Sequence, residues 1–381
     1  MAEPDLLIVG GGPAGLFCAI AARRQGLEVE LIDARKPPLD KACGEGLMPD
    51  GLKLLEAEGV ELPNCRRFAG ISYHQGDLRV AGRFPEGYLG AGIRRLELHQ
   101  ALLRRAEEAG VQLRWGLKAE SLLPDGAGIQ TADGELRARY VIGADGLHSK
   151  LRQWTGLEGK PAKEQRFGVR RHYAIEPWSD LVEVHWGKGV EAYITPVGEK
   201  EIGVAFLWSG CKASFDLLLA EFPELKKRLV GAETTSKDRG AGPLEQRTRG
   251  LRRGKVLLLG DAAGYLDAIT GEGLSLAFHQ GAALAEAIAA GRPEFYPKQS
   301  KKLCRWPLLL TRLTLALERK PALRQRVLQA FAAEPRLFER FLAVHCRALP
   351  PVKLFAPDFL ASLLGGVLAP GDQSSPPARS R

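Results

Sequence analysis

The hydrophobic pattern at the start of the chain predicts a strand, a helix and a second strand in close succession. Residues 6–9 are Leu-Leu-Ile-Val, a continuous apolar run that is expected of a strand buried on both faces. Residues 17–24 are rich in alanine and predict a helix that ends near Gly26. Residues 27–32 predict the second strand, and Asp33 follows it directly. Such a unit is typical of a parallel α/β sheet.

A glycine motif joins the first strand to the helix. Gly10, Gly12 and Gly15 form G-x-G-x-x-G, in which the first glycine permits a tight turn, the second lets a pyrophosphate approach, and the third lets helix and strand pack closely. The helix N-terminus adds free N–H groups and the positive end of its dipole. Asp33 stands about 20 residues further on, where a carboxylate accepts hydrogen bonds from an adenosine ribose. The unit predicts a dinucleotide site, and a glycine-rich turn without a ligand is the alternative.

Further along the chain, continuous apolar runs typical of buried strands lie on either side of a segment of short strands and turns. Apolar strands over 141–144 and 256–259 end in polar turns at Asp145-Gly146 and Gly260-Asp261. Residues 160–245 instead carry short β-branched and aromatic runs, which predict an antiparallel sheet followed by a helix over 215–229. The predicted parts are a nucleotide-binding domain over 1–67, 94–159 and 246–295, a hairpin of the substrate sheet over 68–93, the sheet itself over 160–245, a basic helical cap over 296–369 and a disordered tail over 370–381.

Composition narrows the class of protein. Apolar residues make up 45% of the chain and charged residues 26%, which is ordinary for a globular protein. The six cysteines are scattered, without C-x-x-C or zinc spacing, so we expect a reducing compartment and no metal site. The first strand begins too early for a signal peptide, and no uncharged apolar run reaches transmembrane length. We therefore expect a cytoplasmic protein, with the inner membrane surface as a second location.

The positive charge is concentrated in one segment. Residues 296–353 contain 13 Lys and Arg against three Glu, an excess of ten that exceeds the net charge of +9 of the whole chain. Leucines and Trp306 fall on one helical face there, and Pro307 is expected to bend the helix or begin a second one. The segment is either a cap over the substrate cavity with a solvated rim or an interfacial helix on anionic lipid. Nucleic-acid binding is not expected, because no recognised module accompanies the charge.

Three motifs rich in glycine and aspartate are now apparent: residues 10–15, 145–146 and 260–261. Together they resemble the motifs of the flavoprotein monooxygenase superfamily, the para-hydroxybenzoate hydroxylase type. Residues 145–152, DGLHSKLR, match the superfamily's DGxxSxxR motif. Residues 41–47, KACGEGL, resemble the CGxGL segment of its geranylgeranyl reductase branch, which is the closer likeness. The resemblance implies an α/β fold: a glutathione-reductase-like Rossmann FAD-binding domain with an inserted antiparallel β-sheet substrate domain and a helical C-terminal region.

The same resemblance implies which residues would contact FAD. Asp261 is expected to hydrogen-bond the ribityl chain, Arg95 to balance the pyrophosphate charge, and the backbone of 271–274 to donate beside the flavin ring. The implied FAD-binding residues are Gly10, Gly12, Pro13, Ala14, Gly15, Asp33, Ala34, Arg35, Cys43, Gly44, Arg95, Asp145, Gly146, Gly260, Asp261, Gly271, Glu272, Gly273 and Leu274.

Candidate pocket residues come from the substrate sheet and from the loops beside the flavin. No catalytic residue is assigned, because the flavin carries the redox step. His172, His185 and Trp186 lie in predicted strands and are interpreted as core or surface residues. The candidate pocket residues are Cys43, Glu45, Met48, Tyr193, Trp208 and Tyr265.

The resemblance implies an FAD-dependent oxidoreductase that acts on a hydrophobic small molecule. The first expectation is a monooxygenase that uses NAD(P)H, the second a geranylgeranyl-reductase-like reductase of isoprenoid C=C bonds, and the third an electron carrier or binding protein. Residues 140–260 hold no second G-x-G-x-x-G, so the donor either docks transiently or is another reduced protein or flavin. The chain departs from the resemblance at two places. Ala268 stands where the family usually has a proline, so the turn beside the flavin is expected to differ, and residues 193–196, YITP, only partly match the reductase branch's YxWxFP-like segment, which weighs against the reductase.

Overall fold

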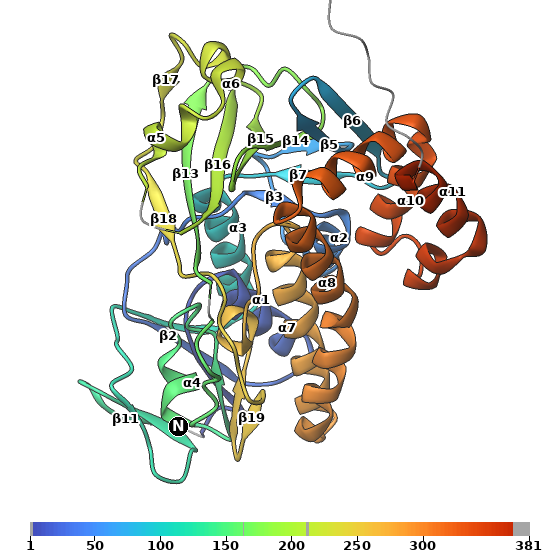
Figure 1. The fold of residues 1–381 in the computed structure, drawn as a ribbon. Coiled ribbons are helices and arrows are strands. Elements are labelled where there is room, and N and C mark those ends of the chain that lie inside the picture. Colours follow the sequence, from blue (N-terminus) through green and yellow to red (C-terminus); the bar gives the residue numbers. More distant parts are fainter. Residues whose placement is uncertain (1–2, 163, 211–212, 369–381) are drawn as a thin grey trace, which may run out of the picture.

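The computed structural model describes residues 3–162, 164–210 and 213–368. The lower half of Figure 1 contains a six-stranded sheet with the order β19-β20-β12-β1-β2-β8. Neighbouring strands are parallel except for the edge pair β19 and β20. The bounds are β1 Leu6–Val9, β2 Val29–Asp33, β8 Gln112–Trp115, β12 Tyr140–Gly143, β19 Arg252–Arg253 and β20 Val256–Leu258. A small antiparallel sheet of β9 Ser121–Leu122, β10 Gly128–Thr131 and β11 Gly134–Arg137 lies beside it.

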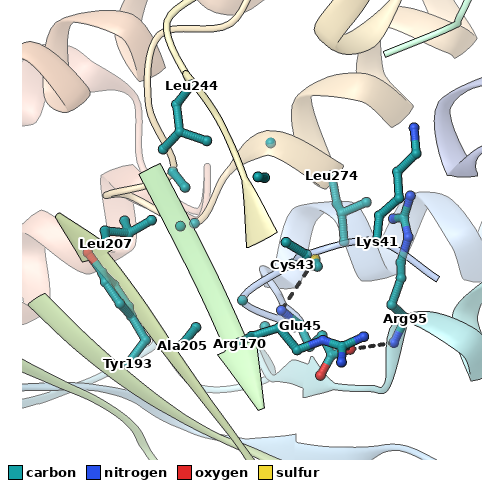
Figure 2. A pocket seen from close by; sticks show the side chains of 18 of the residues that line it. Lys41, Cys43, Glu45, Arg95, Arg170, Tyr193, Ala205, Leu207, Leu244 and Leu274 are labelled. Carbon is teal, nitrogen blue, oxygen red and sulfur yellow. Dashed lines mark hydrogen bonds and ion pairs between the residues drawn. The ribbon is translucent and has the colours of Figure 1, made fainter. Parts of the chain in front are cut away.

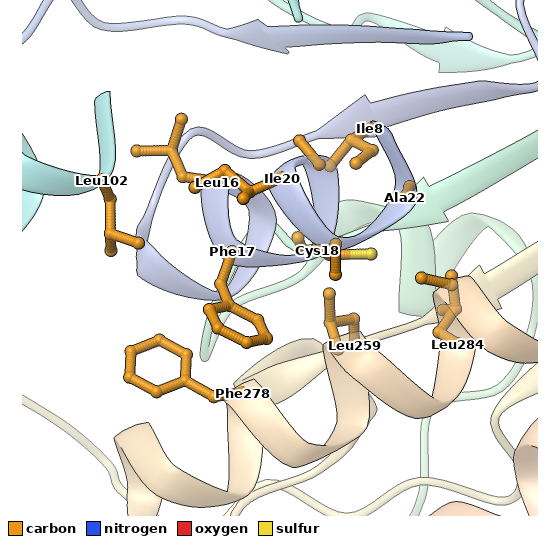
Figure 3. Packing of buried hydrophobic residues seen from close by; sticks show 14 of the residues in the cluster. Ile8, Leu16, Phe17, Cys18, Ile20, Ala22, Leu102, Leu259, Phe278 and Leu284 are labelled. Atoms are coloured by element: carbon orange, nitrogen blue, oxygen red, sulfur yellow. The ribbon is translucent and has the colours of Figure 1, made fainter. Parts of the chain in front are cut away.

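Helices α1 Pro13–Arg24 and α7 Gly273–Ala289 pack against each other beside this sheet. Figure 3 shows Phe17 of α1 facing Phe278 of α7, with ring centroids 4.7 Å apart. Both rings are fully buried, and Gly281 lets the backbones approach because a Cβ there would lie 3.1 Å from the Phe17 ring. Helix α3 Arg95–Glu108 also packs on α1. The apolar helix predicted at the start of the chain is thus enclosed on several sides.

A second, larger sheet forms the upper half of Figure 1, with the order β17-β13-β16-β15-β14-β5-β6 and β18 paired to β13. Strands β14 and β5 are parallel and the other pairs are antiparallel. The bounds are β5 Gly70–Gln75, β6 Leu78–Arg83, β13 Arg166–Ala174, β14 Val182–Trp186, β15 Val190–Gly198, β16 Glu201–Ser209, β17 Glu233–Thr234 and β18 Arg239–Ala241. The predicted fold class, a parallel α/β domain with an inserted antiparallel sheet, is confirmed.

Short elements connect the two sheets and the C-terminal helices. A three-stranded sheet is made of β3 Gly46–Leu47, β7 Gly90–Gly92 and β4 Arg66–Phe68. Further helices are α2 Pro49–Ala57, α4 Lys150–Trp154, η1 Gly260–Ala263, η2 Pro293–Phe295, α8 Tyr296–Glu318, α9 Pro321–Ala333, α10 Pro335–His345, η3 Pro351–Phe355 and α11 Pro357–Leu368. Helices α9 and α10 pack on β6, so the C-terminal helices cover the edge of the larger sheet. Within the described part of the chain, none of the helices combines the length and the apolar character that crossing a bilayer requires.

Proline residues bear on two of the predicted helices. The predicted helix over 215–229 is two helices, α5 Phe215–Leu219 and α6 Pro223–Arg228, because Pro223 has no N–H to continue the first and begins the second. Pro307, by contrast, lies inside the continuous α8. A proline at this position removes the N–H that would bond Leu303 O, and the Arg347 side chain donates to that oxygen instead, at 3.1 Å. The predicted disordered tail over 370–381 lies outside the described residues.

Candidate active site

A cavity of about 630 Å³ lies where the two sheets meet. Figure 2 shows side chains that line it, from the loop that carries Lys41, Cys43 and Glu45, from α3, and from strands β13, β15 and β16. One end is formed by the glycine turn and by Asp145 and Asp261, and it is polar. The other end is predominantly apolar and is lined by Phe68, Ile71, Tyr73, Val182, Val184, Leu207, Leu244, Phe341 and Leu342. The cavity therefore joins a polar groove to an apolar chamber.

The glycine turn has the geometry that the motif predicts. Gly10 has φ +117°, and a Cβ there would lie 2.3 Å from Ala144 O. A Cβ on Gly15 would lie 1.9 Å from Gly10 O, so strand and helix can approach this closely only without side chains. The face of Gly12 is open, since the nearest atom to a Cβ there is Arg95 Nη2 at 3.8 Å. The turn thus exposes its backbone toward the cavity at one glycine, as the approach of a pyrophosphate requires.

Asp33, at the end of β2, fixes the glycine turn through hydrogen bonds to backbone N–H groups. Its Oδ2 accepts from Gly11 N at 2.9 Å and its Oδ1 accepts from Arg35 N at 2.8 Å. These two bonds hold the carboxylate at the end of β2. Its contact with an adenosine ribose stays a prediction.

His99 on α3 supports the same turn. Its Nε2 lies 2.9 Å from Gly11 O and must carry the proton, because a carbonyl only accepts. Its Nδ1 is buried and has no hydrogen-bond partner among the described residues. Burial, the largest cause, lowers the pKa of His99 from 6.5 to about 4. A second proton on this ring would be a buried donor without an acceptor beneath the nucleotide turn.

We expect acid to destabilise the protein through His99. The unfolded histidine gains its proton below about pH 6.5 and the folded one only near pH 4, so the free energy of unfolding falls as the pH falls through this window. His99→Gln keeps a donor for Gly11 O but cannot titrate, and it should lessen the loss between pH 6.5 and 4.5 by about 1–2 kcal/mol. Urea unfolding at several pH values measures this. The pKa of His74 is also lowered, but His74 is present in the wild type and in His99→Gln and therefore affects both equally. If the free energy of unfolding depends on pH in the same way in the two proteins, the role of His99 is contradicted.

The DGxxSxxR motif joins two loops at the polar end of the cavity. Asp145 Oδ2 accepts from Lys150 N at 2.7 Å, and Ser149 caps α4 by accepting from Arg152 N at 3.0 Å. The Arg152 side chain is buried and donates to the backbone oxygens of Asp261, at 3.2 Å, and of Ala262, at 3.1 Å. The arginine of the motif therefore positions η1 and the carboxylate of Asp261.

Cationic groups converge on the same groove. Arg95 lines the cavity, and its buried Nε has no hydrogen-bond partner among the described residues. Burial lowers the pKa of Lys41, with Arg35 and Arg95 adding to the effect, and burial raises the pKa of Asp261 against the pull of Lys41, Arg95 and Arg152. A partly exposed guanidinium whose buried Nε has no partner among the described residues, beside an open glycine face, fits the pyrophosphate of FAD. These observations are consistent with a site for this cofactor.

Glu45 connects the nucleotide side of the cavity to the substrate sheet. It has φ +59°, an uncommon conformation for a residue other than glycine, and it is almost fully buried. Its Oε1 accepts from Arg95 N at 2.7 Å, and its Oε2 is hydrogen-bonded to His172 Nε2 on β13. Arg170 Nε lies 3.6 Å from Oε1, and the Arg170 guanidinium also bonds Asp40. The strained residue is therefore held from both domains.

The sequence pattern favours a core or surface position for His172 and does not single out Arg170 or Asp40. The signal was present in residues 166–172 of β13, RFGVRRH, where polar side chains interrupt a strand that is otherwise buried. A buried polar side chain requires a hydrogen-bond partner, so the polar residues of this strand indicate that charged partners lie on neighbouring elements.

The structure places five of the six candidate pocket residues at the cavity: Cys43, Glu45, Met48, Tyr193 and Tyr265. Trp208 instead packs in the hydrophobic cluster on the opposite face of the sheet, with its ring 5.7 Å from that of Phe167. Alternation along β16 is the reason, since Ala205 and Leu207 point into the cavity and the next residue points away.

Most of the implied FAD-binding residues also line the cavity. These are Gly12, Pro13, Ala14, Cys43, Gly44, Arg95, Asp145, Gly146, Asp261, Gly271, Gly273 and Leu274. Glu272 is not among the lining residues, and its Oε2 lies 3.7 Å from Nδ1 of His345, which does line the cavity. Gly10, Gly15, Asp33 and Gly260 shape the turns behind the lining, and Gly260 needs its φ of +59°. Ala34 and Arg35 follow Asp33 at the end of β2.

A buried ionic cluster that the sequence pattern does not indicate lies beside the apolar chamber. Arg166 on β13 donates to Glu191 Oε2 at 2.7 Å and to Asp267 Oδ2 at 2.9 Å, and it lies 3.8 Å from Glu318 Oε1. Burial raises the pKa of Glu191 to about 7. Asp267 also accepts from Ile269 N at 2.9 Å, so the cluster fixes the loop that lines the cavity at Ala268 and Ile269.

Comparisons with known proteins agree with this geometry. Residues 3–187 match the family model of an FAD binding domain. A menaquinone reductase of Mycobacterium tuberculosis is 29% identical over 338 residues, covering 80% of this chain and 79% of the relative. A digeranylgeranylglycerophospholipid reductase of Methanosarcina acetivorans is 27% identical over 315 residues, covering 75% and 76%.

The fold also matches solved structures. The crystal structure of a flavoprotein/dehydrogenase from Cytophaga hutchinsonii superposes with a TM-score of 0.80 at 19% identity, covering 92% of this chain and 94% of that one. The likeness spans both sheets and shows that the fold is shared. The match to an FAD binding domain, the two reductase relatives and the shared fold lead together to one conclusion: this chain is an FAD-dependent oxidoreductase whose relatives include menaquinone and digeranylgeranylglycerophospholipid reductases.

Proposed function

We propose that the enzyme reduces a carbon–carbon double bond in a long, apolar, isoprenoid-like substrate. The observation that carries the proposal is the apolar chamber continuous with the flavin groove. Its walls come from β5, β14, β16 and α10, and they offer aliphatic and aromatic surface with few charges. Such a wall binds hydrocarbon by removing it from water, at about 25 cal/mol per Å². The names of the two reductase relatives support the same class of substrate.

Bound FAD would supply the hydride, and the chain would position the alkene and deliver a proton. Cys43 is suited to the second task. Its thiol lines the cavity, and burial raises its pKa, so it keeps its proton at neutral pH. The Cys43 Sγ is held by a hydrogen bond from Glu45 N at 3.4 Å. Tyr193 is less suited, because its hydroxyl already donates to Ile269 O at 3.0 Å.

Hydroxylation by a monooxygenase reaction is the second candidate. The departure of residues 193–196 from the reductase pattern favours this second candidate, because Tyr193 and Thr195 of that segment line the cavity. In either reaction we propose NAD(P)H as the electron donor, docking transiently at the FAD groove, and a reduced partner protein as the alternative donor. Anaerobic bleaching of the flavin by NADH or NADPH tests the donor directly.

The experiment that separates the two reactions is product analysis with the FAD-loaded protein. The photoreduced enzyme is mixed with a polyprenyl alkene without oxygen, and then with oxygen. Reduction predicts a product with two added hydrogens that forms anaerobically. Hydroxylation predicts a product with one added oxygen that forms only with oxygen. Absence of both products over a range of prenyl lengths would favour an electron carrier and overturn the proposal.

A cavity-filling variant is the matched control. Ala205 points into the apolar chamber from β16 (Figure 2), so Ala205→Trp should block the substrate without changing the flavin content. Turnover that persists in this variant would place the reaction outside the chamber.

We also propose that the enzyme associates peripherally with anionic membranes. Lys298, Lys301, Lys302 and Arg305 are exposed on α8. The Trp306 ring on the same helix lies 5.6 Å from that of Phe355, where an exposed apolar surface begins. That surface continues along α11 and comprises Val352, Phe355, Leu360, Leu364 and Leu368. Basic and apolar groups side by side suit the interface of an anionic bilayer, from which a lipid-like substrate could enter.

Vesicle co-sedimentation is expected to detect this association. Binding should require anionic lipid and weaken as salt rises, because charge attraction is screened over about 8 Å at physiological ionic strength. Charge reversal of Lys298, Lys301, Lys302 and Arg305 should abolish the salt-sensitive part without loss of FAD. Reversal of the exposed Lys226 and Lys227 on α6 is the control and should change nothing. If the wild type stays in the supernatant with anionic vesicles at low salt, the proposal is wrong and residues 296–353 form a cap over the substrate cavity with a solvated rim.

A further inference from the structure

Two histidines and a glutamate gather at the seam of the larger sheet. His74 on β5 and His185 on β14 are opposite each other in the parallel register, and their rings stack with centroids 4.2 Å apart. Glu183, two residues earlier on β14, is buried, and its Oε2 lies 3.0 Å from His185 Nε2. One potential ligand atom from each residue lies within 4.8 Å of the others. Spacing along the sequence could not reveal this set, because strand pairing assembles it.

The set lies on the face of the sheet away from the substrate. Side chains alternate along a strand, and Ile71, Tyr73, Val182 and Val184 point into the cavity. His74, Glu183 and His185 occupy the intervening positions and therefore point the opposite way. Arg228 of α6 approaches this face, with Nη1 3.8 Å from Glu183 Oε2. The cluster is thus separate from the flavin and the substrate chamber.

The chemistry of the three groups suits a transition metal. An imidazole binds a metal ion through the lone pair of its unprotonated ring nitrogen. Ser72 Oγ lies 2.9 Å from His74 Nε2. If Nε2 donates to this hydroxyl, Nδ1 is left with a free lone pair, an arrangement in which an outer partner orients a ligand ring. The carboxylate would supply the third ligand and negative charge.

We propose that His74, His185 and Glu183 form a binding site for a first-row divalent transition metal ion, with Zn²⁺ as the natural probe. Two imidazoles and one carboxylate are a donor set that such ions accept, with water completing the coordination. Two ligands at about 2.1 Å from one ion lie at most about 4.2 Å apart, so the stacked imidazole rings must rotate out of their parallel arrangement for the set to close on one ion. The ion ties β5 to β14, two strands from distant parts of the chain that form the parallel seam of the sheet.

The test is metal binding by the FAD-loaded full chain after treatment with a chelator. Isothermal titration with ZnCl₂, followed by metal analysis of the dialysed protein, should give one Zn²⁺ per chain, and the midpoint of thermal unfolding should rise with Zn²⁺ concentration. His74→Gln, His185→Gln and Glu183→Gln should each weaken binding at least about 10-fold, the lower end of what even outer-sphere partners cost. X-ray absorption should show nitrogen and oxygen ligands at about 2.0–2.1 Å.

Two further variants keep the proposal falsifiable if a ligand variant folds poorly. His279→Gln is the control, because His279 also contacts a carboxylate, Asp50 Oδ2 at 2.9 Å, but that carboxylate is already paired with Arg347. It should bind Zn²⁺ as the wild type does. Arg228→Gln removes the cation that competes for Glu183 and should bind at least as tightly. A wild type that binds no Zn²⁺, or one whose binding survives in all three ligand variants, would leave the cluster as a stacked pair with an ion pair and overturn the proposal.

Discussion

Replacing Arg166 with methionine should destabilise the protein by about 3–5 kcal/mol, the usual cost of leaving buried charge without its partner. Arg166 is the shared counter-ion of Glu191, Asp267 and Glu318, and all four side chains are nearly inaccessible. Without it, the carboxylates must take up protons to remain buried. Protonation is easier in acid, so the variant should lose more stability at pH 8 than at pH 5. Urea unfolding at the two pH values measures both effects.

Arg137 provides a matched control on the surface. It also pairs with two carboxylates, Asp125 Oδ2 at 2.8 Å and Glu135 Oε2 at 3.1 Å, but all three groups are exposed. Arg137→Met should therefore cost far less stability than Arg166→Met and show little dependence on pH, because exposed ion pairs contribute little. Equal losses in the two variants would mean that burial of the Arg166 cluster carries no special energetic weight.

Asp261→Ala should weaken FAD binding about 10- to 150-fold. The carboxylate follows β20 at the polar end of the cavity, and its expected partners are the ribityl hydroxyls of the flavin. Losing a hydrogen bond to a charged group costs roughly 1.5–3 kcal/mol, which corresponds to that range of affinity. Titration of the apoprotein with FAD, followed by flavin fluorescence, gives the dissociation constant.

The conservative variant Asp261→Asn keeps an oxygen acceptor and should lose less than the alanine variant. Far-ultraviolet circular dichroism should be unchanged in both, because the Arg152 bonds that position η1 go to backbone oxygens rather than to the carboxylate. An affinity within twofold of wild type in Asp261→Ala would remove the ribityl assignment.

The parts of the site that the sequence predicted well are those made by neighbours in the chain. The glycine turn, its helix and Asp33 lie within one βαβ unit, so local pattern and backbone geometry suffice to predict them. The alternation that sends Trp208 away from the cavity is also local, but its phase depends on which face of the sheet is covered, and the sequence does not specify that.

The parts that could not be predicted join distant segments. Glu45 and His172 are 127 positions apart, and Arg152 reaches an oxygen 110 positions away. From the sequence, each of these residues is only a polar side chain in a predicted loop or strand, and its distant partner is not indicated. Only the requirement that buried polar groups find partners hints at such pairs, and it does not say which partner is chosen. The continuous α8 through Pro307 is a similar case, because Arg347 from beyond α10 supplies the missing donor.

The strand order of the parallel sheet also governs when the nucleotide site can form during synthesis. Strand β12 is flanked by β1, made before it, and by β20, which emerges only after the whole inserted sheet. At about 5–20 residues per second, the ribosome delivers β20 on the order of ten seconds after β12. Throughout that interval the outer edge of β12 is unpaired, and such edges are prone to join other chains. Nascent chains of this enzyme should therefore depend on chaperones until β20 has been made, although the other parallel strands are complete once β12 has emerged.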